Sequence, residues 1–313
     1  MDRLTFPSPS GPLAGYLWPK QDPKAVLQIV HGMAEHAARY AYVAKAFVER
    51  GFAVVAHDHR GHGETAEPAA KGKRRDFEGA LLGHMGDDDS WTRAVEDVHF
   101  VRRQIGERFP DLPVVQLAHS MGSFMAQQQL YQYPGDYAAV ALSGSNGKPP
   151  AIAALGRGVT RIERMRLGKR KPSALLQKLS FGDFNKGFEG RTEFDWLSRE
   201  PGQVDAYVAD PHCGFALTVQ SWVDMLDALG ELTKPRNLAS LRMDLPIYLL
   251  AGSDDPVGER GKGVERLRDA YLGAGVTNVT LKLWDGGRHE ILNETNRDQV
   301  INELLSFYET VLG

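Results

Sequence analysis

The stretch VVQLAHSMG at residues 114–122 decides the fold, because a short apolar run ends in a serine held between small residues. Residues 114–119 are typical of a buried strand, and a helical pattern follows at once. A sharp turn of this kind, a nucleophile elbow, forces its serine into a sparsely populated backbone conformation and exposes the hydroxyl above a sheet. The stretch therefore predicts Ser120 to be a nucleophile mounted between a strand and a helix.

The usual elbow reads Gly-x-Ser-x-Gly, and Ala118 stands where its first glycine is expected. The substitution adds one methyl group, which we expect the turn to tolerate. The alternative is that Ser120 only caps the helix, since serine is a favoured N-cap residue. The stretch alone leaves both interpretations open, so the decision depends on partner residues elsewhere.

On either side of this stretch, β-rich runs alternate with helical patterns, which is typical of a sheet flanked by helices. The expected strands are residues 4–6, 13–18, 25–30, 52–56, 114–119, 138–142, 245–251 and 279–284. The expected helices are residues 40–49, 90–105, the segment after Ser120, 262–271 and 298–312. The first two strands form a hairpin pattern, and the later alternation predicts a mostly parallel central sheet. We interpret the acidic residues 87–89 as a cap for the helix that follows them, and not as a metal site.

The alternation stops between Ser143 and about Ser240, where charged and aromatic helical fragments take over. We interpret this part as a helical cap inserted over the carboxyl edge of the sheet, where ligands bind in α/β folds. The chain is thus divided into a first core part at 1–143, a cap insertion at 144–240 and a second core part at 241–313. Apolar cap residues could line an acyl tunnel or simply pack: Met165, Leu167, Leu175, Leu176, Leu179, Phe181, Phe215, Leu217 and Trp222.

Composition narrows the classes of function. The 313 residues carry 37 Lys and Arg against 40 Asp and Glu, a net charge of −3 that gives no broad attraction for nucleic acid. The single cysteine, Cys213, excludes an intrachain disulfide. The first twenty residues do not resemble a signal peptide, and no apolar window is long enough to span a membrane. We therefore expect a soluble, cytoplasmic protein; its oligomeric state is not predicted.

A basic segment at residues 157–178 has one acidic residue, Glu163. Such a segment is either a solvated face of the cap or a surface that contacts anionic membranes or phospholipids. Its cationic residues are Arg157, Arg161, Arg164, Arg166, Lys169, Arg170, Lys171 and Lys178.

Partners for Ser120 follow two later strands. A serine hydroxyl needs a histidine to take its proton and a carboxylate to orient that histidine, in the chain order Ser, Asp or Glu, His. Asp255 follows the strand at 245–251, and His289 follows the strand at 279–284. Asp254 competes for the acid role, but Pro256 restricts Asp255 and helps to hold its carboxylate still. We predict a Ser120, Asp255 and His289 triad.

The oxyanion formed by attack on an ester requires two preorganised N–H donors. The residue after the nucleophile, Met121, supplies one, and Met33, after the strand at 25–30, is our choice for the other. His31 and His36 could suggest a metal pair, but no third ligand accompanies them at a sensible spacing. We expect no metal and no cofactor.

Taken together, these residues resemble the α/β-hydrolase superfamily, and within it the monoacylglycerol lipase and lysophospholipase group of serine aminopeptidase S33-type hydrolases. The motifs are HGMAEH at 31–36 with RY at 39–40, DHRGHG at 58–63, HSMG at 119–122, GSDD at 252–255 and HE at 289–290. The resemblance covers nearly the whole chain, and the family's Gly-x-x-Asp spacing also points to Asp255. It implies the α/β-hydrolase fold and a cofactor-independent serine esterase of lipid metabolism.

The main hypothesis is a carboxylic ester hydrolase that acts through an acyl-enzyme on monoacylglycerols, lysophospholipids or small acyl esters. A second hypothesis keeps the triad but makes the protein an N-terminal aminopeptidase, which needs cap acids to receive an ammonium group. A third is a ligand receptor without turnover, which an intact triad disfavours. The candidate cap acids are Glu189, Glu193, Asp195, Glu200 and Asp205.

Overall fold

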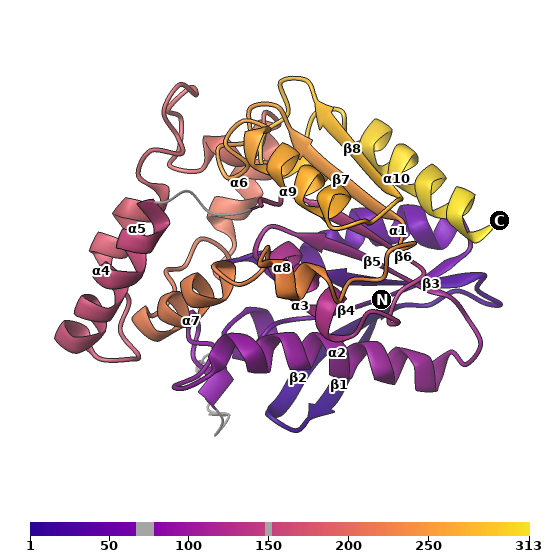
Figure 1. Cartoon of the computed structure of the whole chain (residues 1–313), viewed down its shortest axis with the longest axis horizontal. Helices are drawn as coiled ribbons and strands as arrows, with labels where there is room; N and C mark the ends of the chain where they lie inside the picture. Colours follow the sequence, from indigo (N-terminus) through magenta and orange to yellow (C-terminus); the bar gives the residue numbers. More distant parts are fainter. Residues whose placement is uncertain (67–77, 148–151) are drawn as a thin grey trace.

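The computed structural model describes residues 1–66, 78–147 and 152–313. In this part of the chain, eight strands form one sheet in the order β1-β2-β4-β3-β5-β6-β7-β8 (Figure 1). Within this sheet the β1–β2 and β2–β4 pairs are antiparallel, and the other five pairs are parallel. The predicted mostly parallel sheet is confirmed. The strands are β1 (Asp2–Ser8), β2 (Gly11–Trp18), β3 (Ala25–Val30), β4 (Phe52–His57), β5 (Val114–His119), β6 (Ala139–Ser143), β7 (Ile247–Gly252) and β8 (Val279–Trp284).

Helices cover both faces of this sheet, which explains why the central strands are mostly apolar, with a buried glutamine in each of β3 and β5, Gln28 and Gln116. On one face, α1 (Ala41–Glu49) and α10 (Arg297–Leu312) pack through residues such as Phe47 and Tyr308. On the other face, α2 (Ser90–Arg108), α3 (Met121–Gln132) and α9 (Lys262–Gly273) contribute residues such as Val98, Met125 and Leu267. Every residue of β3, β4, β5, β6 and β7 is buried.

The acidic residues before α2 do not act as the predicted cap. Asp89 lies at the N-cap position in a left-handed conformation and makes no side-chain capping bond. The Ser90 N–H instead donates to Asp224 Oδ2 of α7 (Val219–Leu229) at 2.9 Å. Asp87 and Asp88 pair with Arg170 and Lys169 of the basic segment. The Asp224 carboxylate of α7 thus accepts the N–H at the start of α2. The prediction that residues 87–89 cap this helix was wrong.

Helices α4 to α8 fill the insertion between β6 and β7. In Figure 1, α4 and α5 lie at the end of the molecule opposite α10. The predicted helical cap is confirmed, while the division at 1–143, 144–240 and 241–313 stays a prediction. None of the helices in the described ranges is long and apolar enough to cross a bilayer. The cap helices are α4 (Ile152–Leu167), α5 (Ala174–Phe181), α6 (Pro201–Ala209), α7 (Val219–Leu229) and α8 (Pro235–Leu238).

Candidate active site

Ser120 lies in the tight turn between β5 and α3, with φ 50° and ψ −122°. Its N–H donates to Ser143 O at 2.9 Å, and its carbonyl accepts the Ser123 N–H at 2.8 Å. These bonds hold a backbone conformation that non-glycine residues rarely adopt. The turn has the strained geometry that the sequence predicts for a nucleophile elbow.

The two small positions of the elbow differ in how much room they have. A Cβ at Gly122 would lie 2.4 Å from the carbonyl oxygens of both Val30 and His31, so only glycine lets α3 approach β3 this closely. Ala118 is fully buried in β5, between partners in β3 and β6. The structure accommodates its methyl group, as expected for this departure from the usual motif.

His289 and Asp255 meet Ser120 from the loops that follow β8 and β7. His289 Nε2 lies 2.9 Å from Ser120 Oγ, and His289 Nδ1 lies 3.0 Å from each Asp255 carboxylate oxygen. A carboxylate can only accept, so Nδ1–H donates to Asp255 and Nε2 is left to accept the serine proton. The adjacent Asp254 donates its backbone N–H to Gly287 O at 2.9 Å.

The environment of His289 favours its protonated form. Burial alone would lower the pKa of His289, but the Asp255 carboxylate and its hydrogen bond, together with Glu290 and Glu35, raise that pKa above its ordinary value. Gly144 leaves room for the imidazole, because its φ is +56° and a Cβ there would lie 2.9 Å from His289 Cε1. The arrangement suits a histidine that takes a proton and holds it briefly.

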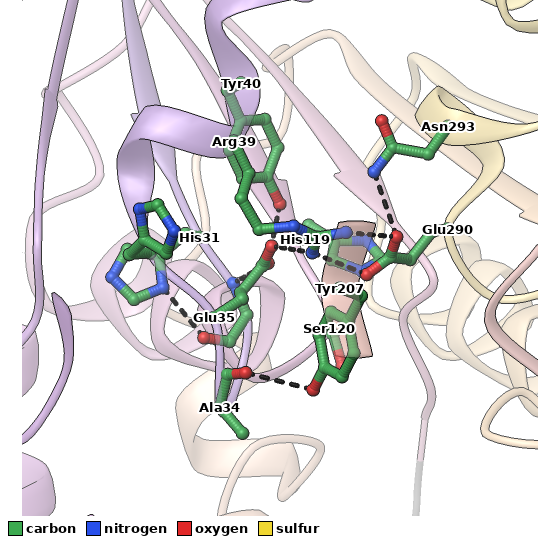
Figure 2. Close-up of polar contacts among 12 residues, drawn as sticks. His31, Ala34, Glu35, Arg39, Tyr40, His119, Ser120, Tyr207, Glu290 and Asn293 are labelled. Atoms are coloured by element: carbon green, nitrogen blue, oxygen red, sulfur yellow. Dashed lines mark hydrogen bonds and ion pairs between the residues drawn. The ribbon is translucent and has the colours of Figure 1, made fainter. Parts of the chain in front are cut away.

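The loop after β3 lies against the serine. A Cβ on Gly32 would lie 3.2 Å from Ser120 Cβ, so the loop backbone closely approaches Ser120. Met33 and Met121, the predicted oxyanion donors, both line the cavity that contains Ser120. Tyr207 of α6 donates its hydroxyl to Ala34 O at 3.0 Å (Figure 2). The cap therefore helps to hold this loop.

A buried ion network, which the sequence analysis missed, joins this loop to the histidine loop (Figure 2). Arg39 Nη1 donates to Glu35 at 2.6 Å, and both Arg39 Nη atoms donate to Glu290 at 2.7 Å. Glu35 in turn accepts the Gly32 N–H at 2.6 Å. Glu290 directly follows His289 in the chain. The only sequence signal for this network was the presence of these charged residues inside the HGMAEH-RY and HE motifs.

Replacing Arg39 by methionine would leave two buried carboxylates without their cation. Burial alone would raise the pKa of Glu290, but Arg39 lowers it to about 2. Breaking a buried ion pair costs about 3–5 kcal/mol, so we expect Arg39→Met to lower the free energy of unfolding by that amount in urea titrations. The control is Arg161→Met, which removes an exposed pair in which one Arg161 nitrogen, Nη2, contacts both carboxylate oxygens of Asp227, and it should cost less than about 1 kcal/mol. Equal losses in the two variants would contradict this account.

Histidines gather behind the loop, and burial lowers the pKa of each below its ordinary value. The pKa of His57 falls to about 3, and those of His62 and His119 fall to about 4. His31 and His59 stack with ring centroids 4.0 Å apart. These rings are therefore neutral in the folded protein at physiological pH.

Acid should destabilise the fold through these rings. A histidine whose folded pKa is depressed contributes full stability above its unfolded pKa of about 6.5, and that contribution falls as the pH drops toward the folded value. Each such ring adds a slope of about 1.4 kcal/mol per pH unit. His57→Phe should flatten urea-derived stability against pH by that amount between pH 6 and 4, because neither His57 ring nitrogen has a hydrogen-bond partner in the described part of the chain. An unchanged slope would refute the assignment.

Above the triad lies a cavity of about 1360 Å³ between core and cap. Among the proposed tunnel residues, Leu176, Leu179, Phe181, Phe215 and Trp222 line it. The others do not appear on its wall: Met165, Leu167, Leu175 and Leu217. Further apolar lining comes from Phe124, Phe184, Trp196, Met225, Leu226 and Leu229. The contact between Ser120 and His289 thus lies on the wall of a large apolar cavity.

Comparison with known proteins agrees with this geometry. A family model described as "Serine aminopeptidase, S33" matches residues 21–296. The chain is 30% identical to a monoacylglycerol lipase of Mycolicibacterium smegmatis, over 92% of this chain and 89% of that protein. It is 27% identical to human monoglyceride lipase, over 89% of this chain and 80% of that protein. A thermostable carboxyl esterase from Bacillus coagulans, solved with glycerol, superposes with a TM-score of 0.88 at 28% identity, covering 100% and 99% of the two chains.

Proposed function

This chain belongs to the serine aminopeptidase S33 family of α/β-hydrolases, and from that premise we propose that it is a carboxylic ester hydrolase that works through an acyl-enzyme on Ser120. The observation that carries the proposal is the continuous contact from Asp255 through His289 to the Ser120 hydroxyl. The similarity of this chain to monoacylglycerol lipases and to a carboxyl esterase supports hydrolysis of esters.

In the proposed mechanism, Ser120 Oγ attacks the ester carbonyl while His289 Nε2 takes the hydroxyl proton. The Met33 and Met121 N–H groups stabilise the negative oxygen of the tetrahedral intermediate. His289 then gives its proton to the departing alcohol, which leaves an acyl group on Ser120. Water repeats the sequence on the acyl-enzyme, with Asp255 holding the imidazole in the required tautomer. No cofactor enters these steps.

The cavity supports a substrate with an apolar acyl chain. Its aromatic and aliphatic wall can remove such a chain from water, at a gain of about 0.8 kcal/mol for each buried CH₂. Monoacylglycerols, lysophospholipids and smaller acyl esters all fit this description. The proposal therefore includes a preference for longer acyl chains over acetate.

The aminopeptidase alternative is disfavoured by the positions of the cap acids. Glu193 lines the cavity, but Glu189 pairs with Arg288 and Asp205 pairs with Arg191. Asp195 is buried and accepts bonds from the 191–192 backbone, and Glu200 caps α6. Of the five proposed carboxylates, Glu193 alone is thus placed to receive a substrate ammonium group, and the cavity around it is mostly apolar.

Turnover of a p-nitrophenyl ester series from acetate to long chains tests the proposed function. We expect kcat/KM to rise with chain length until the cavity is filled. The same protein should be assayed against aminoacyl p-nitroanilides. Faster turnover of the anilides would favour the aminopeptidase, and no turnover of either series by a folded protein would favour a receptor.

Membrane contact through the basic cap is a further part of the proposal. Exposed Ile162 and Met165 of α4, with Leu175 and Leu179 of α5, lie among the arginines and lysines of the basic segment. Leu179 also lines the cavity, so this apolar surface reaches the cavity wall. Such a surface suits a peripheral contact with anionic lipid.

Sedimentation with vesicles tests the membrane contact. Anionic phospholipid vesicles should carry the protein down more strongly than zwitterionic ones, and Met165→Glu should weaken this binding. Val208→Glu is the matched control, because Val208 is an exposed apolar residue of α6 outside the basic segment. Equal effects of the two variants, or no binding, would remove this part of the proposal.

A further inference from the structure

We propose that His36, Asp210 and Cys213 form a binding site for one divalent transition-metal ion of the zinc class. The donor atoms of the three side chains all lie within 4.8 Å of one another. His36 Nε2 lies 2.9 Å from Asp210 Oδ2. The sequence offers His31 and His36 as a metal pair without a third ligand at a sensible spacing, so no metal was expected. The fold supplies two ligands from the cap instead.

The two segments that supply the donors are held together by their backbones. The Gly214 N–H donates to Ala34 O at 3.0 Å, which joins the segment after α6 to the loop after β3. Within the cap segment, the Cys213 N–H donates to Asp210 O at 3.0 Å and the His212 N–H donates to Asp210 Oδ1 at 2.8 Å. The donors therefore lie on ordered backbone on both sides of the site.

His31 takes no part in this site. Its Nε2 accepts the His59 N–H at 3.0 Å, and its Nδ1 lies 2.8 Å from Gly32 O. His36 points instead toward the cap, where the His212 ring lies edge-on with its centroid 5.9 Å away. The two histidines of the HGMAEH motif thus have separate surroundings.

The donor set is chemically selective. One thiolate, one imidazole and one carboxylate form a mixed set that zinc accepts in tetrahedral geometry, with the fourth position left to water. A soft sulfur ligand disfavours magnesium and calcium, which prefer oxygen. The site is half-buried, so an ion can enter from solvent.

Metal binding should release the proton of the Cys213 thiol, because the form of cysteine that binds a metal ion is the thiolate.

Cobalt(II) is the probe for this site, because a cobalt–thiolate bond absorbs strongly in the near ultraviolet and the chain has a single cysteine. Titration of the reduced protein should give this absorption with an end point of one ion per chain, and zinc should remove it by displacement. Zinc should also raise the thermal midpoint of unfolding, since it binds the folded state. These readouts do not depend on the proposed esterase activity.

Variants distinguish a site formed by all three ligands from adventitious metal binding to the cysteine thiol alone. Cys213→Ser should abolish the absorption, and Asp210→Asn should weaken cobalt binding at least tenfold. His99→Ala is the matched control, because His99 and Asp136 form a comparable pair at 2.8 Å on the core, and this variant should bind cobalt normally. No thiolate absorption at one equivalent, or equal binding by Asp210→Asn and the parent, would show that His36 and Asp210 form only an ion pair.

Discussion

Replacing Ser120 by alanine should lower kcat/KM for ester hydrolysis by on the order of 10⁶-fold, the largest effect that we expect from any single change. The reason is that no acyl-enzyme can form without Oγ, while the cavity and the N–H donors remain. The residual rate should lie above that of the uncatalysed reaction, because bound substrate would still be polarised for attack by water. Initial rates on the best p-nitrophenyl ester measure the loss.

The Ser120→Ala variant should keep its fold, because the strained turn is held by backbone hydrogen bonds. Circular dichroism and the urea midpoint check this point. Ser145→Ala is a matched control, since Ser145 is a buried serine of the neighbouring loop whose Oγ contacts Ser123 and Gln127. Retained turnover in Ser120→Ala, or an equal loss in Ser145→Ala, would contradict the assignment.

Replacing Asp255 by asparagine should lower kcat by on the order of 10⁴-fold with little change in KM. The carboxylate now accepts Nδ1–H of His289 through both oxygens. An asparagine amide can turn its NH₂ group toward Nδ1, which moves the ring proton to Nε2. The imidazole then has no lone pair for the serine proton, although all the side chains remain in place.

Asp254→Asn is the control for this prediction, because the carboxylate that accepts His289 Nδ1–H belongs to Asp255, while the hydrogen bond given for Asp254 comes from its backbone N–H to Gly287 O. It should retain turnover close to that of the parent. Steady-state kinetics across pH, with the two variants side by side, make the comparison. If Asp254→Asn lowers kcat as much as Asp255→Asn does, the effect would come from a destabilised loop and not from the tautomer of His289.

The parts of the fold that the sequence predicts well are those with local signals. A window of ten residues is enough to predict each of three features: the strand at Val114–His119, the small residues around Ser120, and the loops that carry Asp255 and His289. The rule that sites gather at the carboxyl ends of parallel strands then places them together. The structure brings these three side chains into contact, and their catalytic roles remain a proposal.

What the sequence could not predict depends on contacts between distant segments. Arg39 and Glu290 are 251 positions apart, so no spacing rule relates them. The same holds for Asp224, which replaces Asp89 at the start of α2, and for the meeting of His36 with Asp210. Local capping preferences are worth about 1 kcal/mol, and tertiary packing readily overrides them.

The measurement that tests the central claim most directly is reaction with a fluorophosphonate, followed by peptide mass spectrometry. The serine mechanism predicts one phosphonyl group per chain, on the peptide that contains Ser120, with loss of ester turnover in the same proportion. Labelling should be absent in Ser120→Ala and strongly slowed in Asp255→Asn. Full inhibition with the label on another residue, or undiminished turnover with Ser120 fully labelled, would contradict the account.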